Sequence, residues 1–128
     1  MFHIRRIFSC LALALTAVAL VAPVSAGESL DMKLVQSHCA ACHTFGKSEP
    51  HGQGPNLYGL IGRKAASASG YTYSSAIAKA LGGRVWTPEL LDAWLADTQA
   101  VAPGTGMTYF QDDQPTRSHL VKYFENLR

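Results

Sequence analysis

The 128-residue chain has no run rich in lysine or arginine, and its formal net charge is only +2. Proteins that bind nucleic acid through electrostatics carry a dense basic patch, so this class of partner is excluded. The chain also has no internal repeat and no block of like charge, and 48% of its residues are hydrophobic. These properties exclude a disordered or fibrous protein and indicate one globular domain.

The N-terminal segment has the three parts of an export signal. Two arginines precede the apolar run IFSCLALALTAVALVA, and Pro23 closes this run before the small-residue sequence VSA. We therefore predict that residues 1–26 are a signal peptide cleaved after Ala26, and that residues 27–128 form the domain exported to the periplasm. The alternative is a retained membrane anchor, because the apolar run is nearly long enough to span a bilayer.

Cysteine is scarce as well, with three residues in the whole chain. Cys10 falls within the predicted signal, so the exported domain would keep only Cys39 and Cys42, with His43 directly after them. No second Cys/His pair at zinc-finger spacing is present, which leaves a structural zinc site without its other half. A thiol redox pair belongs where a strand meets a helix in an α/β fold, and no such pattern surrounds this one.

The sequence CAACH, residues 39–43, therefore predicts covalent attachment of one haem c. Two thiols at this spacing can add to the two vinyl groups of a porphyrin, and the small alanines between them leave room for the ring. The imidazole of His43 would then lie beneath the iron as its proximal ligand.

An electron-carrying haem needs a second axial ligand, and we predict Met107 for this role. Met107 lies in APGTGMTY, where Pro103, Gly104 and Gly106 exclude a regular helix and favour a loop. Filling a gap in the core is the alternative role for a methionine, and we assign it to Met32, which lies in a helical run. The rival ligands are His38, His51 and His119.

Five fragments, in this order, resemble one family: CAACHTF, GPNLYGLIGRKAASASGYTYS, VWTPELLDAWL, PGTGMTY and LVKYF. Together they cover nearly all of residues 27–128. The chain is similar to the small class I cytochromes c of the mitochondrial and photosynthetic-bacterial branch. The resemblance implies an all-α fold of about four helices, with long loops wrapped around one covalent haem.

The resemblance also implies roles for single residues. Pro55 matches the proline whose carbonyl accepts a hydrogen bond from the axial histidine, and Leu57 matches an apolar contact to the haem face. Trp94 matches an aromatic residue near the methionine ligand, although core packing is an alternative role for a tryptophan here. The residues that match hydrogen-bond donors around a haem propionate are Arg63, Tyr73 and Trp86.

Two positions depart from the family pattern. Asp31 stands where a glycine often allows the first and last helices to cross closely, so the closeness of that crossing is in question. Gly106 stands where a lysine commonly precedes the methionine ligand, and lysines around the haem edge are few. Removal of the signal would leave nine lysine and arginine residues against nine aspartate and glutamate residues. We therefore do not expect strong positive charge to govern docking.

The helices that we expect cover residues 30–42, 74–81, 88–97 and 115–127. Thr87 is a suitable N-cap with a proline directly after it, and Gln114 or Thr116 is expected to open the last helix. Glycine and proline recur over residues 43–73 without strand alternation, which predicts a long loop around a ligand.

These observations predict a periplasmic one-electron carrier, not an enzyme, that shuttles electrons between redox proteins of a respiratory or photosynthetic chain. Its donor and acceptor would be membrane or periplasmic redox proteins, and the exported domain would be monomeric and not inserted in a membrane. The first alternative is a peroxidase-like or gas-binding haem protein with a labile methionine ligand. Such a protein needs a distal acid–base residue, and the loop around Met107 contains no histidine or arginine. The second alternative is a cytochrome subunit of an exported dehydrogenase.

Overall fold

The computed structural model describes residues 26–128, and this part of the chain contains five helices and no strand. The helices are α1 (Ala26–Cys39), α2 (Ser75–Leu81), α3 (Pro88–Ala96), α4 (Thr98–Val101) and α5 (Gln114–Asn126). The prediction of an all-α fold is confirmed, with five helices in place of about four. The predicted signal peptide lies, apart from Ala26, outside the described residues. None of the described helices is long and apolar enough to cross a membrane.

The starts of α2, α3 and α5 follow from side-chain capping. Ser74 accepts a hydrogen bond from the backbone of α2, and Thr87 accepts one at 3.2 Å from the Leu90 amide of α3, as its position before a proline predicts. The last helix begins at Gln114, one of the two residues that were expected to open it, but neither of these two residues is its N-cap. Asp113 is the N-cap of α5, because its carboxylate accepts a hydrogen bond at 2.8 Å from the Thr116 amide.

The first helix begins at Ala26 instead of residue 30, and its end and the segment after α3 also differ from the prediction. The first helix ends at Cys39 instead of residue 42, because the amides of Cys42 and His43 both donate to the Cys39 carbonyl in a tight turn. The short helix α4 was not expected. Asp97 ends α3 and also caps α4. Its Oδ1 accepts hydrogen bonds from the amides of Gln99 and Ala100, at 2.9 and 3.1 Å.

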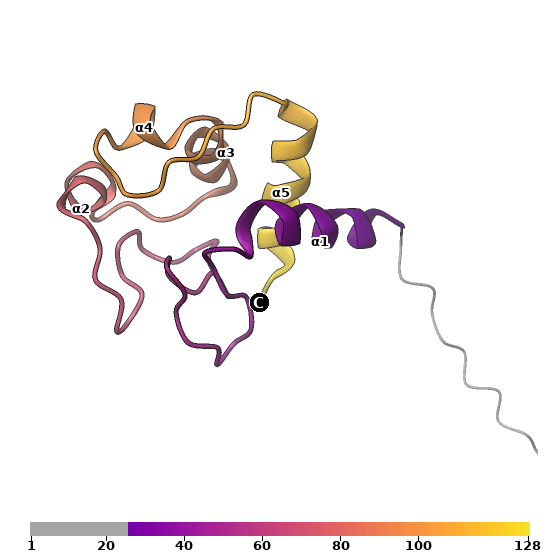
Figure 1. Cartoon of the computed structure of the whole chain (residues 1–128), viewed down its shortest axis with the longest axis horizontal. Helices are drawn as coiled ribbons and strands as arrows, with labels where there is room; N and C mark the ends of the chain where they lie inside the picture. The colour runs from indigo at the N-terminus through magenta and orange to yellow at the C-terminus, as the bar shows by residue number, and fades with distance from the viewer. Residues whose placement is uncertain (1–25) are drawn as a thin grey trace, which may run out of the picture.

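Helices α1 and α5 cross and pack against each other, and α5 also packs against α3 (Figure 1). Val35 of α1 and Leu120 and Phe124 of α5 are fully buried in this core. Asp31 is also buried, with 3% of its surface exposed, and it contacts α5. The aspartate therefore does not prevent the two helices from packing.

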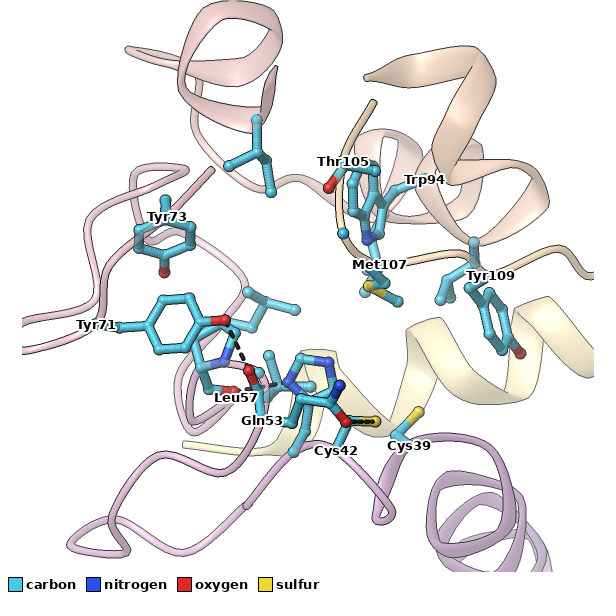
Figure 2. A pocket seen from close by; sticks show the side chains of 18 of the residues that line it. Cys39, Cys42, Gln53, Leu57, Tyr71, Tyr73, Trp94, Thr105, Met107 and Tyr109 are labelled. Atoms are coloured by element: carbon cyan, nitrogen blue, oxygen red, sulfur yellow. Dashed lines mark hydrogen bonds between the residues drawn. The ribbon is translucent and has the colours of Figure 1, made fainter. Parts of the chain in front are cut away.

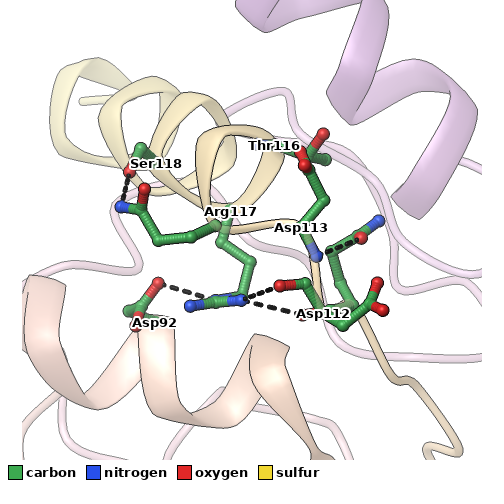
Figure 3. A network of polar contacts seen from close by, with 8 residues as sticks. Asp92, Asp112, Asp113, Thr116, Arg117 and Ser118 are labelled. Carbon is green, nitrogen blue, oxygen red and sulfur yellow. Dashed lines mark hydrogen bonds and ion pairs between the residues drawn. The ribbon is translucent and has the colours of Figure 1, made fainter.

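Arg117 joins three parts of the chain (Figure 3). Its Nε donates to Asp92 of α3 at 2.9 Å, and its Nη1 donates to the carbonyls of Gln111 and Asp112, each at 3.0 Å. Only 13% of the Arg117 side chain is exposed. We call residues 102–110 the methionine loop. The network holds the segment directly after this loop, Gln111 and Asp112, against α3 and α5.

Candidate functional site

A cavity of about 750 Å³ lies between the loops and the helices. Sites for small molecules and cofactors commonly have volumes of about 300–1,000 Å³ and mainly apolar walls. All ten site residues predicted from the sequence line this one cavity: Cys39, Cys42, His43, Pro55, Leu57, Arg63, Tyr73, Trp86, Trp94 and Met107. These ten residues come from four of the five sequence fragments, and Phe124 of the fifth fragment also lines the cavity.

The two cysteines lie on the same side of the cavity (Figure 2). Cys39 is the last residue of α1 and Cys42 lies in the turn that follows, and neither thiol takes part in a disulfide. Burial, helped by the neighbouring Cys42, raises the pKa of the Cys39 thiol to about 12. Thiol redox sites need the opposite, a thiol whose pKa is lowered so that the thiolate is present. Cys39, buried and with a raised pKa, therefore lacks the property that a thiol redox site needs.

A zinc site is not supported either. Within residues 26–128 no group of three or more histidine, cysteine, aspartate or glutamate side chains is arranged to hold a metal ion. Structural zinc requires four such ligands in a tetrahedron.

The ring of His43 is held in one orientation. Its Nδ1 lies 2.7 Å from the Pro55 carbonyl oxygen, so Nδ1 carries the proton and donates, and Nε2 is left with a free lone pair. Burial lowers the pKa of His43, and the hydrogen bond to Pro55 opposes this effect only in part. Burial thus favours the neutral imidazole, which is the form that binds a metal.

Gly54 packs directly on the ring of His43, a role that the sequence reasoning missed. A Cβ atom at residue 54 would lie 2.7 Å from Nδ1 and 2.8 Å from Nε2 of the imidazole. The Gly54 amide also donates to the Cys42 carbonyl at 2.8 Å, which keeps the two backbones side by side. A glycine directly before the ligand-orienting Pro55 was the available signal, because only glycine allows a ring this close to the backbone.

Met107 lies on the opposite side of the cavity from the two cysteines (Figure 2). Its backbone is held by α4, because its carbonyl accepts hydrogen bonds from Thr98 Oγ1 at 2.6 Å and from Gln99 Nε2 at 3.3 Å. Thr98 is fully buried and also accepts a hydrogen bond from the Tyr109 amide at 3.0 Å. Gln99 further accepts a hydrogen bond from the amide of Gly104 at 3.0 Å. The unexpected helix α4 therefore supports the methionine loop.

The residues predicted to surround a propionate lie at another part of the cavity. The guanidinium of Arg63 donates to the carbonyls of Asn56 and Tyr58 at 3.0 and 3.3 Å, and burial lowers the pKa of Arg63. The hydroxyl oxygen of Tyr73 accepts a hydrogen bond from the Ala68 amide at 3.2 Å. These two carbonyls use one N–H of each Nη, which fixes the guanidinium and leaves three of its five N–H groups for other acceptors.

The aromatic residues form two pairs around the cavity. Trp86 and Trp94 are both buried and meet edge to face, with ring centroids 5.9 Å apart. Tyr73 meets Tyr71 in the same way at 4.9 Å, and the hydroxyl of Tyr71 donates to the Gln53 carbonyl at 2.8 Å. Tyr71 is not among the site residues predicted from the sequence. Its position two residues before Tyr73 was the available signal.

Of the three rival histidines, His38 alone lines the cavity. His51 is occupied on both ring nitrogens, by the Asn56 amide and the Ser69 carbonyl, and His119 is bonded to Asp31. The prediction that Met32 fills the core is wrong. Met32 is 54% exposed, because α1 turns this face to solvent.

The described helices and loops thus surround a large, mainly apolar cavity. Two cysteines and a free imidazole nitrogen lie on one side of it and a thioether lies on the other. These groups fit a covalently bound haem. Cysteines attach the haem, and the nitrogen of an imidazole and the sulfur of a thioether are ligands of haem iron. The fold and the site define a haem-binding helical domain.

Comparison with known proteins identifies the family. The chain is 38% identical over 104 residues to cytochrome c2 of Rhodopila globiformis, which covers 80% of this chain and 95% of that protein. It is 40% identical over 79 residues to cytochrome c of Trypanosoma brucei brucei. This match covers 61% of this chain and 83% of the relative. Cytochrome c of Cannabis sativa is 35% identical to it over 94 residues, and this match covers 73% of this chain and 83% of the relative. No family model matches the chain.

The chain therefore belongs to the cytochrome c family of haem electron carriers. Its fold is the all-α class I cytochrome c fold, and its cofactor is haem c attached through Cys39 and Cys42. Both of these predictions from the sequence are confirmed.

Proposed function

We propose that this cytochrome is an exported one-electron carrier whose haem has His43 and Met107 as axial ligands. The observation that carries the proposal is the position of these two groups. The hydrogen bond to Pro55 leaves Nε2 of His43 free, and Met107 lies across the cavity from the haem-attaching cysteines. Bound haem supplies a one-electron couple, and the two protein ligands leave no open position for a substrate.

Further residues support the role of carrier and not of enzyme. Met107 is held by Thr98 and Gln99, so the methionine is presented by a supported loop and not by a free one. Arg63, Tyr73 and Trp86 line the cavity, which supports their proposed role around a haem propionate. Leu57 and Trp94 line it as well, which supports their proposed role as its apolar wall. The sequence of residues 1–26 supports export to the periplasm, followed by release from the membrane.

The partners that we propose are membrane or periplasmic redox proteins of a respiratory or photosynthetic chain, each bound transiently by a monomer. An exposed apolar residue of the methionine loop supports this, since Phe110, the last residue of the loop, is 68% exposed. Transient redox interfaces are small, with a total buried area below about 1,200 Å².

A redox titration of the purified holoprotein with Met107→Ala tests the axial ligand. A soft thioether favours ferrous iron, so its loss should lower the reduction potential, by about 59 mV for each tenfold loss of relative ferrous stability. Met32→Ala is the matched control, because Met32 is exposed and lies outside the cavity. An unchanged potential and an unchanged ferric spectrum in Met107→Ala would overturn the assignment.

Two further measurements test the carrier role and the export. Ferrous holoprotein should bind carbon monoxide poorly, whereas rapid binding would favour the ligand-binding alternative. The mass of the purified holoprotein should equal residues 27–128 plus one haem, and a mass that includes residues 1–26 would support a retained anchor instead. Size-exclusion chromatography of a native extract should show a monomer, since co-elution with a dehydrogenase would favour the subunit alternative.

A further inference from the structure

The methionine loop, residues 102–110, is attached to the rest of the protein on two unequal sides. On one side, Thr98 and Gln99 of α4 form every hydrogen bond from the loop to that helix. On the other side, the loop reaches α1 through one hydrogen bond in the described structure. This bond joins Oη of Tyr109 and Nδ1 of His38 over 3.0 Å.

The geometry of this second attachment is well defined. The rings of Tyr109 and His38 meet edge to face, with centroids 6.1 Å apart and an interplanar angle of 79°. Both side chains are half-buried and both line the haem cavity. His38 directly precedes Cys39, which is joined to the haem, and Tyr109 is two residues beyond Met107. The bond therefore connects the cysteine side of the cavity with the methionine side.

We propose that Tyr109 and His38 are positioning residues that latch the methionine loop over the haem and keep Met107 at the axial position. This inference rests on the proposed function, because it takes Met107 to be the axial ligand. Thr98 is fully buried and holds three backbone atoms of the loop, so the α4 side remains attached when the loop moves. The side with a single hydrogen bond is the side that opens.

An external ligand binds only to the open form, so its apparent affinity measures how often the latch is open. The free energy of one neutral hydrogen bond is large enough to change the population of the open form about 2- to 12-fold. We therefore expect Tyr109→Phe, which keeps the ring and removes Oη, to raise the affinity of ferric holoprotein for cyanide by this factor. His38→Ala should raise it similarly, and the double variant should add little to either single change.

Tyr58→Phe is the matched control. Tyr58 is also half-buried, but it lies outside the haem cavity, and its replacement should leave the cyanide affinity unchanged. Amide hydrogen exchange provides a second readout that does not depend on the axial ligand. Tyr109→Phe should speed exchange in residues 104–109 but not in α3.

The outcomes separate this inference from the proposed function. If Met107→Ala leaves the ferric spectrum and the cyanide affinity unchanged, the ligand assignment fails. If Met107→Ala raises the affinity but Tyr109→Phe and His38→Ala match the wild type in affinity and in exchange, the ligand assignment stands and the latch is overturned. Additive effects of the two latch variants would also overturn it, because residues that act through one shared bond are not additive.

Discussion

The buried carboxylate of Asp31 on α1 accepts a hydrogen bond at 2.6 Å from Nδ1 of His119 on α5. Nζ of Lys122 lies 3.9 Å from the other oxygen of the same carboxylate. Cytochromes c often have glycine at the position of Asp31, which allows the first and last helices to approach closely. In this protein a polar pair joins the two helices beside the apolar contacts of Val35 and Leu120.

This pair predicts a non-additive effect on stability. His119→Ala leaves a buried carboxylate without its main partner, and we expect the free energy of unfolding to fall by about 1–3 kcal/mol. Asp31→Ala together with His119→Ala should cost less than the sum of the single changes, because the buried charge is then absent. Denaturant unfolding of the holoprotein measures this cycle, with the exposed Glu125→Ala as a control. Strict additivity would show that the two residues do not interact.

Gly54 predicts a steric effect at the haem ligand. In Gly54→Ala the new methyl group would overlap the His43 ring, so we expect a loss of about 1–3 kcal/mol of stability and a changed visible spectrum. Gly106→Ala is the control, since a Cβ atom there meets no protein atom within 4 Å. If both variants unfold alike and share the wild-type spectrum, Gly54 has no special role.

The hydrogen bonds of Glu49 predict that part of the stability of the folded protein depends on pH in the acid range. Its carboxylate accepts hydrogen bonds from the amides of Gly46 and Phe45, which lower the pKa of Glu49 below its ordinary value of 4.5. A carboxyl group whose pKa is lowered in the folded state stabilises the protein above its unfolded pKa, and this contribution is lost as the pH falls through the folded pKa. The contribution is therefore present at neutral pH and decreases below pH 4.5.

Glu49→Gln should consequently be less stable than the wild type at neutral pH, and the difference should shrink in acid. Unfolding free energies measured from neutral pH to below 4.5 test this expectation. Glu125→Gln is the control, because the exposed carboxylate of Glu125 accepts no hydrogen bond from residues 26–128. A pH-independent difference between wild type and Glu49→Gln would contradict the prediction.

The charge balance predicts how electron transfer depends on salt. Residues 27–128 contain nine basic and nine acidic side chains, so long-range attraction contributes little to the encounter with a partner. The electron-transfer rate should therefore change only slightly with ionic strength, although charges are screened over about 10 Å at 0.1 M salt. Gly106→Lys should make the dependence steeper with an acidic partner. A steep dependence in the wild type would show that local charge governs docking.

The sequence alone determined the cofactor chemistry and much of the site. Residues 39–43 are adjacent in the chain, so their spacing carries the attachment of haem without any tertiary information. The glycine and proline around Met107 exclude a helix by local backbone preference, and Thr87 with its following proline marks a helix start for the same reason. These features depend on neighbours within a few residues, and a single sequence displays such neighbours directly.

Only the tertiary structure decided the contacts between distant residues. The partner of Asp31 is 88 residues away, and 71 residues separate His38 from Tyr109. The exposure of Met32 depends on which face of α1 meets α5, and the support of the methionine loop depends on a helix of four residues, too short to show a period. Local preference cannot determine such features, because they arise when helices distant in sequence pack around one cavity.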